Sequence, residues 1–307
     1  MGRFLPSAAV PGILAALAAL LYSCTGGELP RADGGRRYTG GRGGGQESSA
    51  QAPGAVPFLK EGALEAGLEK GKVPAALRAA MDGAELPPDI RRGIEAETEA
   101  FLGELARVLG EDVYLRKLVD KQHPLPSGYE PGDLIELRYK SYRAGIADTM
   151  LLRSKAEEAL EAMAAAAKAE GLTLTVSSAY RSYEYQTGSF ERWTKRLGLE
   201  QAQRVSARPG KSQHQLGLAV DFGSISNDFA ETAAGRWVKA HAGRFGWSLS
   251  YPREYEDLTG YSWESWHYRY VGPSLVSFID TWFAGIQQYA LRFIHWWEYP
   301  EDPAGSI

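Results

Sequence analysis

A carboxylate in the middle of an apolar run constrains this sequence more than any other feature. Residues 218–222 (Leu-Ala-Val-Asp-Phe) are typical of a buried β-strand, and Asp221 is the ionisable residue within it. A carboxylate in such a strand is costly to bury unless it is paired or binds a metal ion. Asp221 therefore predicts a cationic partner, and a metal ion would serve.

Two histidines add to this candidate metal site. His214 precedes Asp221 in the same stretch, and His267 lies in a second, distant segment. The chain has one cysteine, Cys24, which excludes an intramolecular disulfide and cysteine-based zinc clusters. A catalytic zinc ion usually keeps three protein ligands and an open position for water. The candidate metal ligands are therefore His214, Asp221 and His267.

Glu264 is the candidate general base. It lies three residues before His267, and in an ideal strand these two side chains would face opposite sides. A bulge or a turn is therefore needed to bring both to one site. A carboxylate placed there would take a proton from a water molecule whose pKa the metal lowers towards neutrality.

Four separated motifs resemble the VanY-like zinc D-alanyl-D-alanine carboxypeptidases. They are Asp-Lys-x-x-Pro-Leu-Pro-x-x-Tyr-x-Pro at 120–131, Tyr-Arg-Ser at 180–182, Ser-x-His-x-x-Gly-x-Ala-x-Asp at 212–221 and Glu-x-Trp-His at 264–267. The resemblance covers residues 118–272, with one departure at Ser265, where relatives often have proline. It implies an α+β fold in which helices flank a small central antiparallel sheet (the hedgehog/D,D-peptidase fold), here with an N-terminal helical extension.

The resemblance also implies roles for individual residues. His214, Asp221 and His267 match the ligands of one Zn²⁺ ion, and Glu264 matches the general base. Arg181 matches the arginine that steadies the substrate carbonyl or the developing oxyanion. The candidate substrate-binding residues are Tyr180, Gln186, Ser212 and Trp266.

The implied reaction is removal of the terminal D-Ala from peptidoglycan stem peptides that end in D-Ala-D-Ala. Four alternatives stay open at this point. The same site could serve a D,D-dipeptidase, an L,D-carboxypeptidase or a cross-link endopeptidase, or the chain could be a non-catalytic module that binds cell-wall peptide. Another divalent ion could also replace zinc, because selectivity often rests on geometry and availability.

Composition argues against nucleic acid as a partner. The net charge is −4, whereas a protein that binds nucleic acid needs a basic face for the phosphates. Hydrophobic residues make up 44% of the chain and charged residues 23%, which is ordinary for a globular protein.

The first 24 residues have the pattern of a secretory signal. Arg3 precedes an almost wholly apolar run over residues 8–21, which is shorter than the roughly 20 apolar residues of a comfortable membrane span. The sequence Leu-Tyr-Ser-Cys at 21–24 resembles the lipobox of bacterial lipoproteins, although Tyr22 departs from the usual small or aliphatic residue. We expect an exported protein of the bacterial cell envelope, anchored to a membrane by lipid on Cys24.

The remaining chain is expected to divide into four parts. They are a flexible linker (25–57), a helical lead-in (58–112), the catalytic domain (113–273) and a C-terminal amphipathic helix with a tail (274–307). The spacing of apolar residues predicts helices over 74–81, 88–109 and 274–298, and a run of strong helix formers predicts a helix over 154–171. Alternation of apolar and polar residues predicts a strand over 172–178.

Overall fold

The computed structural model describes residues 73–137 and 150–300, and all of these belong to one compact unit. The expected signal segment with Cys24, the expected linker and the first part of the lead-in lie outside the described residues. Within the described ranges, no helix is both long enough and apolar enough to span a membrane.

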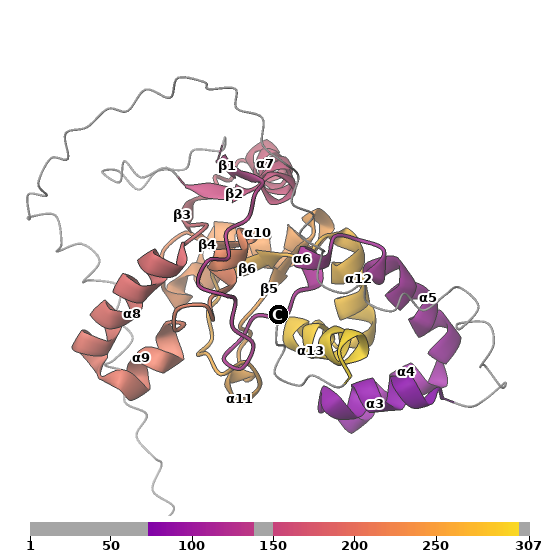
Figure 1. The fold of residues 1–307 in the computed structure, drawn as a ribbon. Helices are drawn as coiled ribbons and strands as arrows, with labels where there is room; N and C mark the ends of the chain where they lie inside the picture. Colours follow the sequence, from indigo (N-terminus) through magenta and orange to yellow (C-terminus); the bar gives the residue numbers. More distant parts are fainter. Residues whose placement is uncertain (1–72, 138–149, 301–307) are drawn as a thin grey trace, which may run out of the picture. The chain divides into compact units, whose positions relative to one another are not determined.

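Four antiparallel strands form the main sheet in the order β3-β4-β6-β5, and β1 and β2 form a separate two-stranded sheet (Figure 1). These sheets and the helices around them confirm the predicted α+β class with a small antiparallel sheet. The strands are β1 Leu134–Glu136, β2 Leu151–Arg153, β3 Val176–Ser178, β4 Ala219–Phe222, β5 Trp247–Leu249 and β6 His267–Tyr270.

The helices precede, separate and follow these strands. The α-helices are α3 Ala75–Gly83, α4 Pro88–Ala96, α5 Thr98–Leu109, α6 Val113–Arg116, α7 Ser154–Ala169, α8 Tyr183–Leu197, α9 Leu199–Val205, α10 Ala233–His241, α11 Glu256–Thr259, α12 Pro273–Trp282 and α13 Gln287–Glu298. The short 3-10 helices are η1 Gln213–Leu216, η2 Asn227–Glu231 and η3 Ala242–Phe245.

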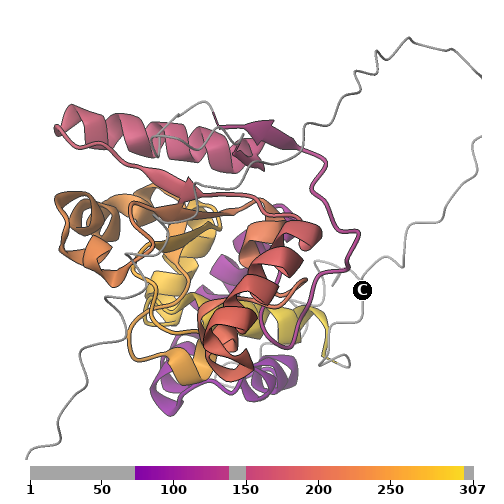
Figure 2. The same ribbon diagram turned by 90° about the vertical axis from the view of Figure 1, so that its left-hand side faces the viewer.

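Helix α7 covers one face of the main sheet, and α13 lies on the opposite side (Figures 1 and 2). The apolar residues of α7 recur at three- and four-residue steps, so they form one buried stripe. This stripe shares a core with Val220 of β4 and Tyr268 of β6. Because side chains alternate along a strand, β4 turns Asp221 away from this core and towards the side where α13 lies.

Helices from both ends of the described chain share a second core. The ring of Phe101 in α5 lies 5.1 Å from that of Phe278 in α12 and 5.2 Å from that of Phe293 in α13. Helix α3 packs tightly on α13, since a Cβ atom at Gly83 would lie 2.3 Å from the ring of Trp296. The sequence indicates that each helix is amphipathic, but it does not show that the N-terminal and C-terminal helices pack on each other.

Two predicted helices are each divided in the structure. The predicted helix over 88–109 breaks at Glu97, where the hydroxyl of Thr98 donates to the carbonyl of Ile94 and competes with the regular helical ladder. The predicted helix over 274–298 breaks between α12 and α13, because Ala284 and Gly285 both adopt positive φ angles. The predicted strand over 172–178 shortens to β3, whose pairing with β4 shifts register between Val176 and Ser178.

Asp120 ties α13 to the segment that precedes the hairpin β1–β2. Its Oδ1 atom accepts from the backbone N–H of Gln122 at 2.8 Å and from both the N–H and the Nδ1 of His123, and its Oδ2 accepts from the Nε2 of Gln288 at 2.8 Å. Burial raises the pKa of Asp120, but the contacts with His123 and the backbone N–H donors outweigh it and hold the pKa at about 2.

We expect Asp120→Asn to lower the free energy of unfolding by about 2–4 kcal/mol at pH 7, because the amide NH₂ would face donors that now meet a carboxylate. The folded-state pKa of about 2 lies below 3.8, the ordinary pKa of an aspartate side chain, so the carboxylate stabilises the fold above pH 4. This contribution is lost as the pH falls from about 4 towards 2. Urea unfolding of the unaltered protein and of Asp120→Asn at pH 7, 4 and 3 measures the difference between their free energies of unfolding. A difference that does not change with pH would contradict this account.

Candidate metal centre

Two of the three candidate metal ligands face each other across neighbouring strands. Asp221 of β4 is paired in register with His267 of β6, and the antiparallel geometry places both side chains on the same face of the sheet. The Oδ1 atom of Asp221 lies 3.0 Å from the Nδ1 atom of His267. Register alone therefore brings together two residues that are 46 positions apart in the chain.

The third candidate ligand, His214, comes from the 3-10 helix η1. The hydroxyl of Ser212 caps this turn by accepting from the N–H of His214 at 3.3 Å. Gly217 ends it with a φ of 68°, and a Cβ atom there would lie 2.8 Å from Leu134 of β1. Glycine is thus required both by the backbone angle and by the close hairpin. The hairpin also holds the turn through the Nε of Arg153, which donates to the carbonyl of Leu216 at 3.0 Å.

His214, Asp221 and His267 form the group of possible metal ligands that the described part of the chain contains. Their candidate ligand atoms all lie within 4.8 Å of one another, and each residue is no more than 4% exposed. The Nε2 atom of His214 lies 3.3 Å from the Oδ2 atom of Asp221. The two imidazole rings are nearly perpendicular, with centroids 4.8 Å apart.

The protonation state of His214 suits a metal ligand. The Nδ1 of His214 lies 2.6 Å from the carbonyl of Ala179, which can only accept, so the proton sits on Nδ1 and the lone pair on Nε2. That buried Nε2 atom has no hydrogen-bond partner among the described residues. Burial and the nearby charge of Arg181 lower the pKa of His214 to about 4, so the ring is neutral at pH 7.

Asp221 is ionised beside these rings. Burial raises its pKa, but the side chains of His214 and His267 outweigh burial and hold the pKa well below its usual value. Two imidazoles and one carboxylate, with a buried nitrogen that lacks a hydrogen-bond partner among the described residues, form a donor set that fits zinc.

Glu264 reaches the same site through a turn. It precedes β6, and the N–H of His267 contacts the carbonyl of Glu264 at 3.4 Å, which is the turn that the sequence spacing requires. The Oε2 atom of Glu264 lies 3.6 Å from the Nδ1 atom of His267. Burial, and then the charge of Asp221, raise the pKa of Glu264 well above its usual value, which makes its carboxylate a stronger base.

Arg181 follows β3 and is held beside η1, where its backbone N–H donates to the carbonyl of His214 at 3.3 Å. Its charge lowers the pKa values of both His214 and Glu264, so the guanidinium lies close to the site. Within the described residues, its buried Nε atom has no hydrogen-bond partner. A guanidinium with a free donor suits a carboxylate or an oxyanion.

The four predicted substrate-binding residues lie in different surroundings. Ser212 is the cap of η1, and the amide of Gln186 donates to the carbonyl of Ala207 at 2.7 Å, so both have contacts within the protein. Trp266 packs in the core beneath α7. Tyr180 is partly exposed, and burial together with the charges of Glu130 and Glu184 raises its pKa.

Sequence reasoning did not single out Gln213. Its Oε1 atom lies 3.3 Å from the Nε2 of His267, on the side of the ring away from Asp221. Gln213 occupies a variable position of the motif at 212–221, so no signal in a single sequence marks it.

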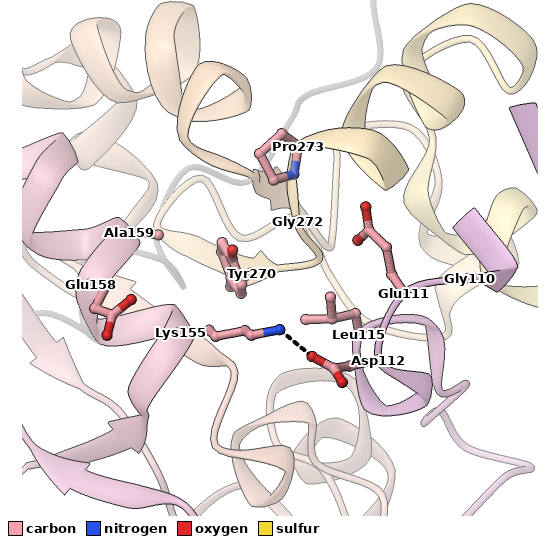
Figure 3. Close-up of a pocket in the computed structure, with 10 residues that line it drawn as sticks. All are labelled: Gly110, Glu111, Asp112, Leu115, Lys155, Glu158, Ala159, Tyr270, Gly272 and Pro273. Carbon is pink, nitrogen blue, oxygen red and sulfur yellow. Dashed lines mark hydrogen bonds and ion pairs between the residues drawn. The ribbon is translucent and has the colours of Figure 1, made fainter. Parts of the chain in front are cut away.

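A separate surface depression of about 730 Å³ lies away from the candidate metal ligands. The ion pair between Asp112 and Lys155 crosses it, and Tyr270 and Glu158 also line it (Figure 3). None of the predicted site residues lines this depression. The candidate chemistry therefore lies elsewhere, on the face of the sheet that carries Asp221.

Comparisons with known proteins agree on one family. The sequence profile of VanY, described as D-alanyl-D-alanine carboxypeptidase, matches residues 149–273. The Bacillus subtilis (strain 168) protein YodJ is 40% identical over 171 residues, which are 53% of this chain and 62% of YodJ. The bifunctional D-Ala-D-Ala dipeptidase and D-Ala-D-Ala carboxypeptidase VanXYC of Enterococcus gallinarum is 30% identical over 164 residues, which are 51% of this chain and 83% of that protein.

A solved structure is also similar. It is a mutant of the vancomycin resistance D,D-pentapeptidase VanY in complex with Zn(II), which is 27% identical, with a TM-score of 0.46 and coverage of 56% of this chain and 96% of that one. The matched part of this chain spans less than two thirds of the length of YodJ.

Proposed function

We propose that this chain, which belongs to the VanY family of D-alanyl-D-alanine carboxypeptidases, is a zinc-dependent carboxypeptidase. Its substrate would be a peptidoglycan stem peptide ending in D-Ala-D-Ala, from which it would hydrolyse the terminal D-Ala. One observation carries the proposal. The ligand atoms of His214, Asp221 and His267 lie within 4.8 Å of one another, with Glu264 3.6 Å from His267.

His214, Asp221 and His267 would hold the zinc ion. Zinc, when bound there, would polarise the scissile carbonyl and make a water molecule more acidic. Glu264 would accept a proton from the attacking water and then deliver it to the departing amine, so that it serves first as base and then as acid. The raised pKa of Glu264 supports both steps, because the group can hold the proton between them.

Arg181 would bind the carbonyl oxygen as negative charge develops on it. Its backbone is held beside η1, and its guanidinium has a buried Nε donor without a partner among the described residues. A donor that is already in place when charge develops needs no reorganisation, and this is where such groups contribute most.

A D,D-dipeptidase is the second candidate. Its support is the similarity to VanXYC, whose name includes both dipeptidase and carboxypeptidase activities. Both reactions would use the same metal and the same base, so they differ in how the cleft receives the rest of the substrate. L,D-carboxypeptidase and endopeptidase activities would differ in the same way.

Incubation with defined substrates tests the proposal. The full-length protein, loaded with zinc, is expected to release D-Ala from a pentapeptide ending in D-Ala-D-Ala, and a chelator should stop the release. Mass spectrometry of parallel reactions with the free dipeptide, an L,D-linked tetrapeptide and a cross-linked muropeptide separates the alternatives. Tight peptide binding without turnover at any zinc concentration would contradict the proposal and favour a non-catalytic binding module.

We also propose that the chain is exported and anchored to a membrane of the bacterial envelope by lipid on Cys24. The apolar run at 8–21 and the motif at 21–24 support this. Metabolic labelling with a lipid precursor in a bacterial host is expected to label the protein, and Cys24→Ala should abolish the label. Equal labelling of both proteins would rule out this anchor.

A further inference from the structure

His267 is held from both sides of its ring. Its Nδ1 atom faces Asp221 and Glu264, and its Nε2 atom faces the Oε1 of Gln213 at 3.3 Å. Both His267 and Gln213 are at most 3% exposed, so water does not readily substitute for this contact. An amide oxygen can only accept a hydrogen bond, so the contact with Gln213 favours the tautomer that carries its proton on Nε2. In that tautomer the lone pair of Nδ1 faces Asp221 and can bind a metal ion held between them.

The orientation of the Gln213 amide is set by further groups behind it. The hydroxyl of Ser250 donates to the same Oε1 atom at 2.7 Å. The Nε2 atom of Gln213 lies 3.4 Å from the Oε1 of Gln287, and the Nε2 of Gln287 donates to the carbonyl of Ser248 at 3.3 Å. Because that backbone carbonyl can only accept, the side-chain amides of Gln287 and Gln213 each have one orientation that satisfies their neighbours. In that orientation the amide oxygen of Gln213 faces His267 as an acceptor.

The outer part of this network comes from beyond the family's matched region. The VanY profile ends at residue 273, whereas Gln287 is the first residue of α13. Helix α13 is held in place by the second core, in which it packs against α3 and α5. The packing of the N-terminal helices on α13 thus affects the metal site through the buried side chain of Gln287.

We infer that Gln213 and Gln287 are positioning residues, which fix the tautomer and the orientation of His267 and so strengthen metal binding. This inference rests on the proposed zinc site. It assigns the helices α3–α5 and α13 a part in that site, because the packing of α13 determines where Gln287 lies. Partners in the second layer around a metal commonly account for roughly 10- to 100-fold in metal affinity.

The test compares three glutamines with similar burial. Gln213→Met and Gln287→Met keep the side-chain length and remove the amide, and Gln288→Met is the matched control on the same helix. Zn²⁺ affinity of each full-length protein is measured by competition with a chelator, and the melting temperature of each metal-free protein is measured in parallel. Gln213→Met is expected to weaken zinc binding by about 10- to 100-fold and Gln287→Met by about 10-fold.

Gln288→Met is expected to keep the zinc affinity of the unaltered chain while lowering the melting temperature. Gln213→Glu is expected to restore zinc binding relative to Gln213→Met, because a carboxylate oxygen also accepts from Nε2. Equal affinities in Gln213→Met, Gln287→Met and the unaltered chain would overturn the positioning role and leave the proposed zinc site intact. Equal weakening in all three methionine variants would overturn it as well, since loss of stability alone would then explain the effect. No zinc binding by the unaltered chain would overturn the proposed function together with this inference.

Discussion

Replacing Glu264 with glutamine is expected to lower kcat for D-Ala release by about 10²- to 10⁴-fold while the protein still binds one zinc ion. The amide keeps the size of the side chain but cannot take a proton from the attacking water. Glu264 lies 3.6 Å from His267, so it is close enough to act at the site without being one of the three clustered ligands. Steady-state kinetics together with metal analysis of the same samples measures both quantities.

Glu231→Gln is a suitable control, because Glu231 is an exposed glutamate at the end of η2. It should retain full activity and full zinc content. Loss of zinc from Glu264→Gln would contradict the role as general base, because it would make Glu264 a metal ligand. Retained activity with full zinc content would contradict it too, since another group would then have to accept the proton.

Arg181→Ala is expected to lower kcat by about 10²- to 10³-fold, as removal of one donor to a developing oxyanion commonly does. The effect should fall on kcat more than on KM, because negative charge on the carbonyl oxygen develops in the transition state. Arg181→Lys should recover part of the activity, since it restores the charge without the planar pair of donors.

An exposed arginine on the next helix, Arg192, provides the control for this variant. Arg192→Ala should change neither kcat nor KM. A rise in KM with unchanged kcat for Arg181→Ala would instead mean that Arg181 binds the ground-state substrate, for example its terminal carboxylate.

Some features of the fold were accessible from the sequence because they depend on local patterns. The helix over 154–171 was predicted from helix-forming residues and matches α7 apart from its last two residues. The breaks at Glu97 and at 283–286 were missed for a physical reason. At each of them the apolar spacing continues through the break, so periodicity alone does not reveal that the backbone leaves the helix.

The candidate site divides in a similar way. His214, Asp221, Glu264 and His267 were singled out from residue type and spacing, together with a family resemblance. Gln213, Ser250 and Gln287 were not, because nothing local distinguishes a glutamine that orients a histidine from one that faces solvent. Their relation exists only where η1, β5 and α13 meet.

The sequence by itself determined which residue types the candidate site can use: oxygen and nitrogen ligands without thiolates, a candidate base three residues from a candidate ligand, and a buried carboxylate that needs a cationic partner. The tertiary structure decided the distances. Pairing of β4 with β6 places Asp221 opposite His267, and the hairpin β1–β2 sets η1 beside them. Hydrogen-bond register and packing between distant segments are collective properties, so no local pattern contains them, and they are what turn separate side chains into one site.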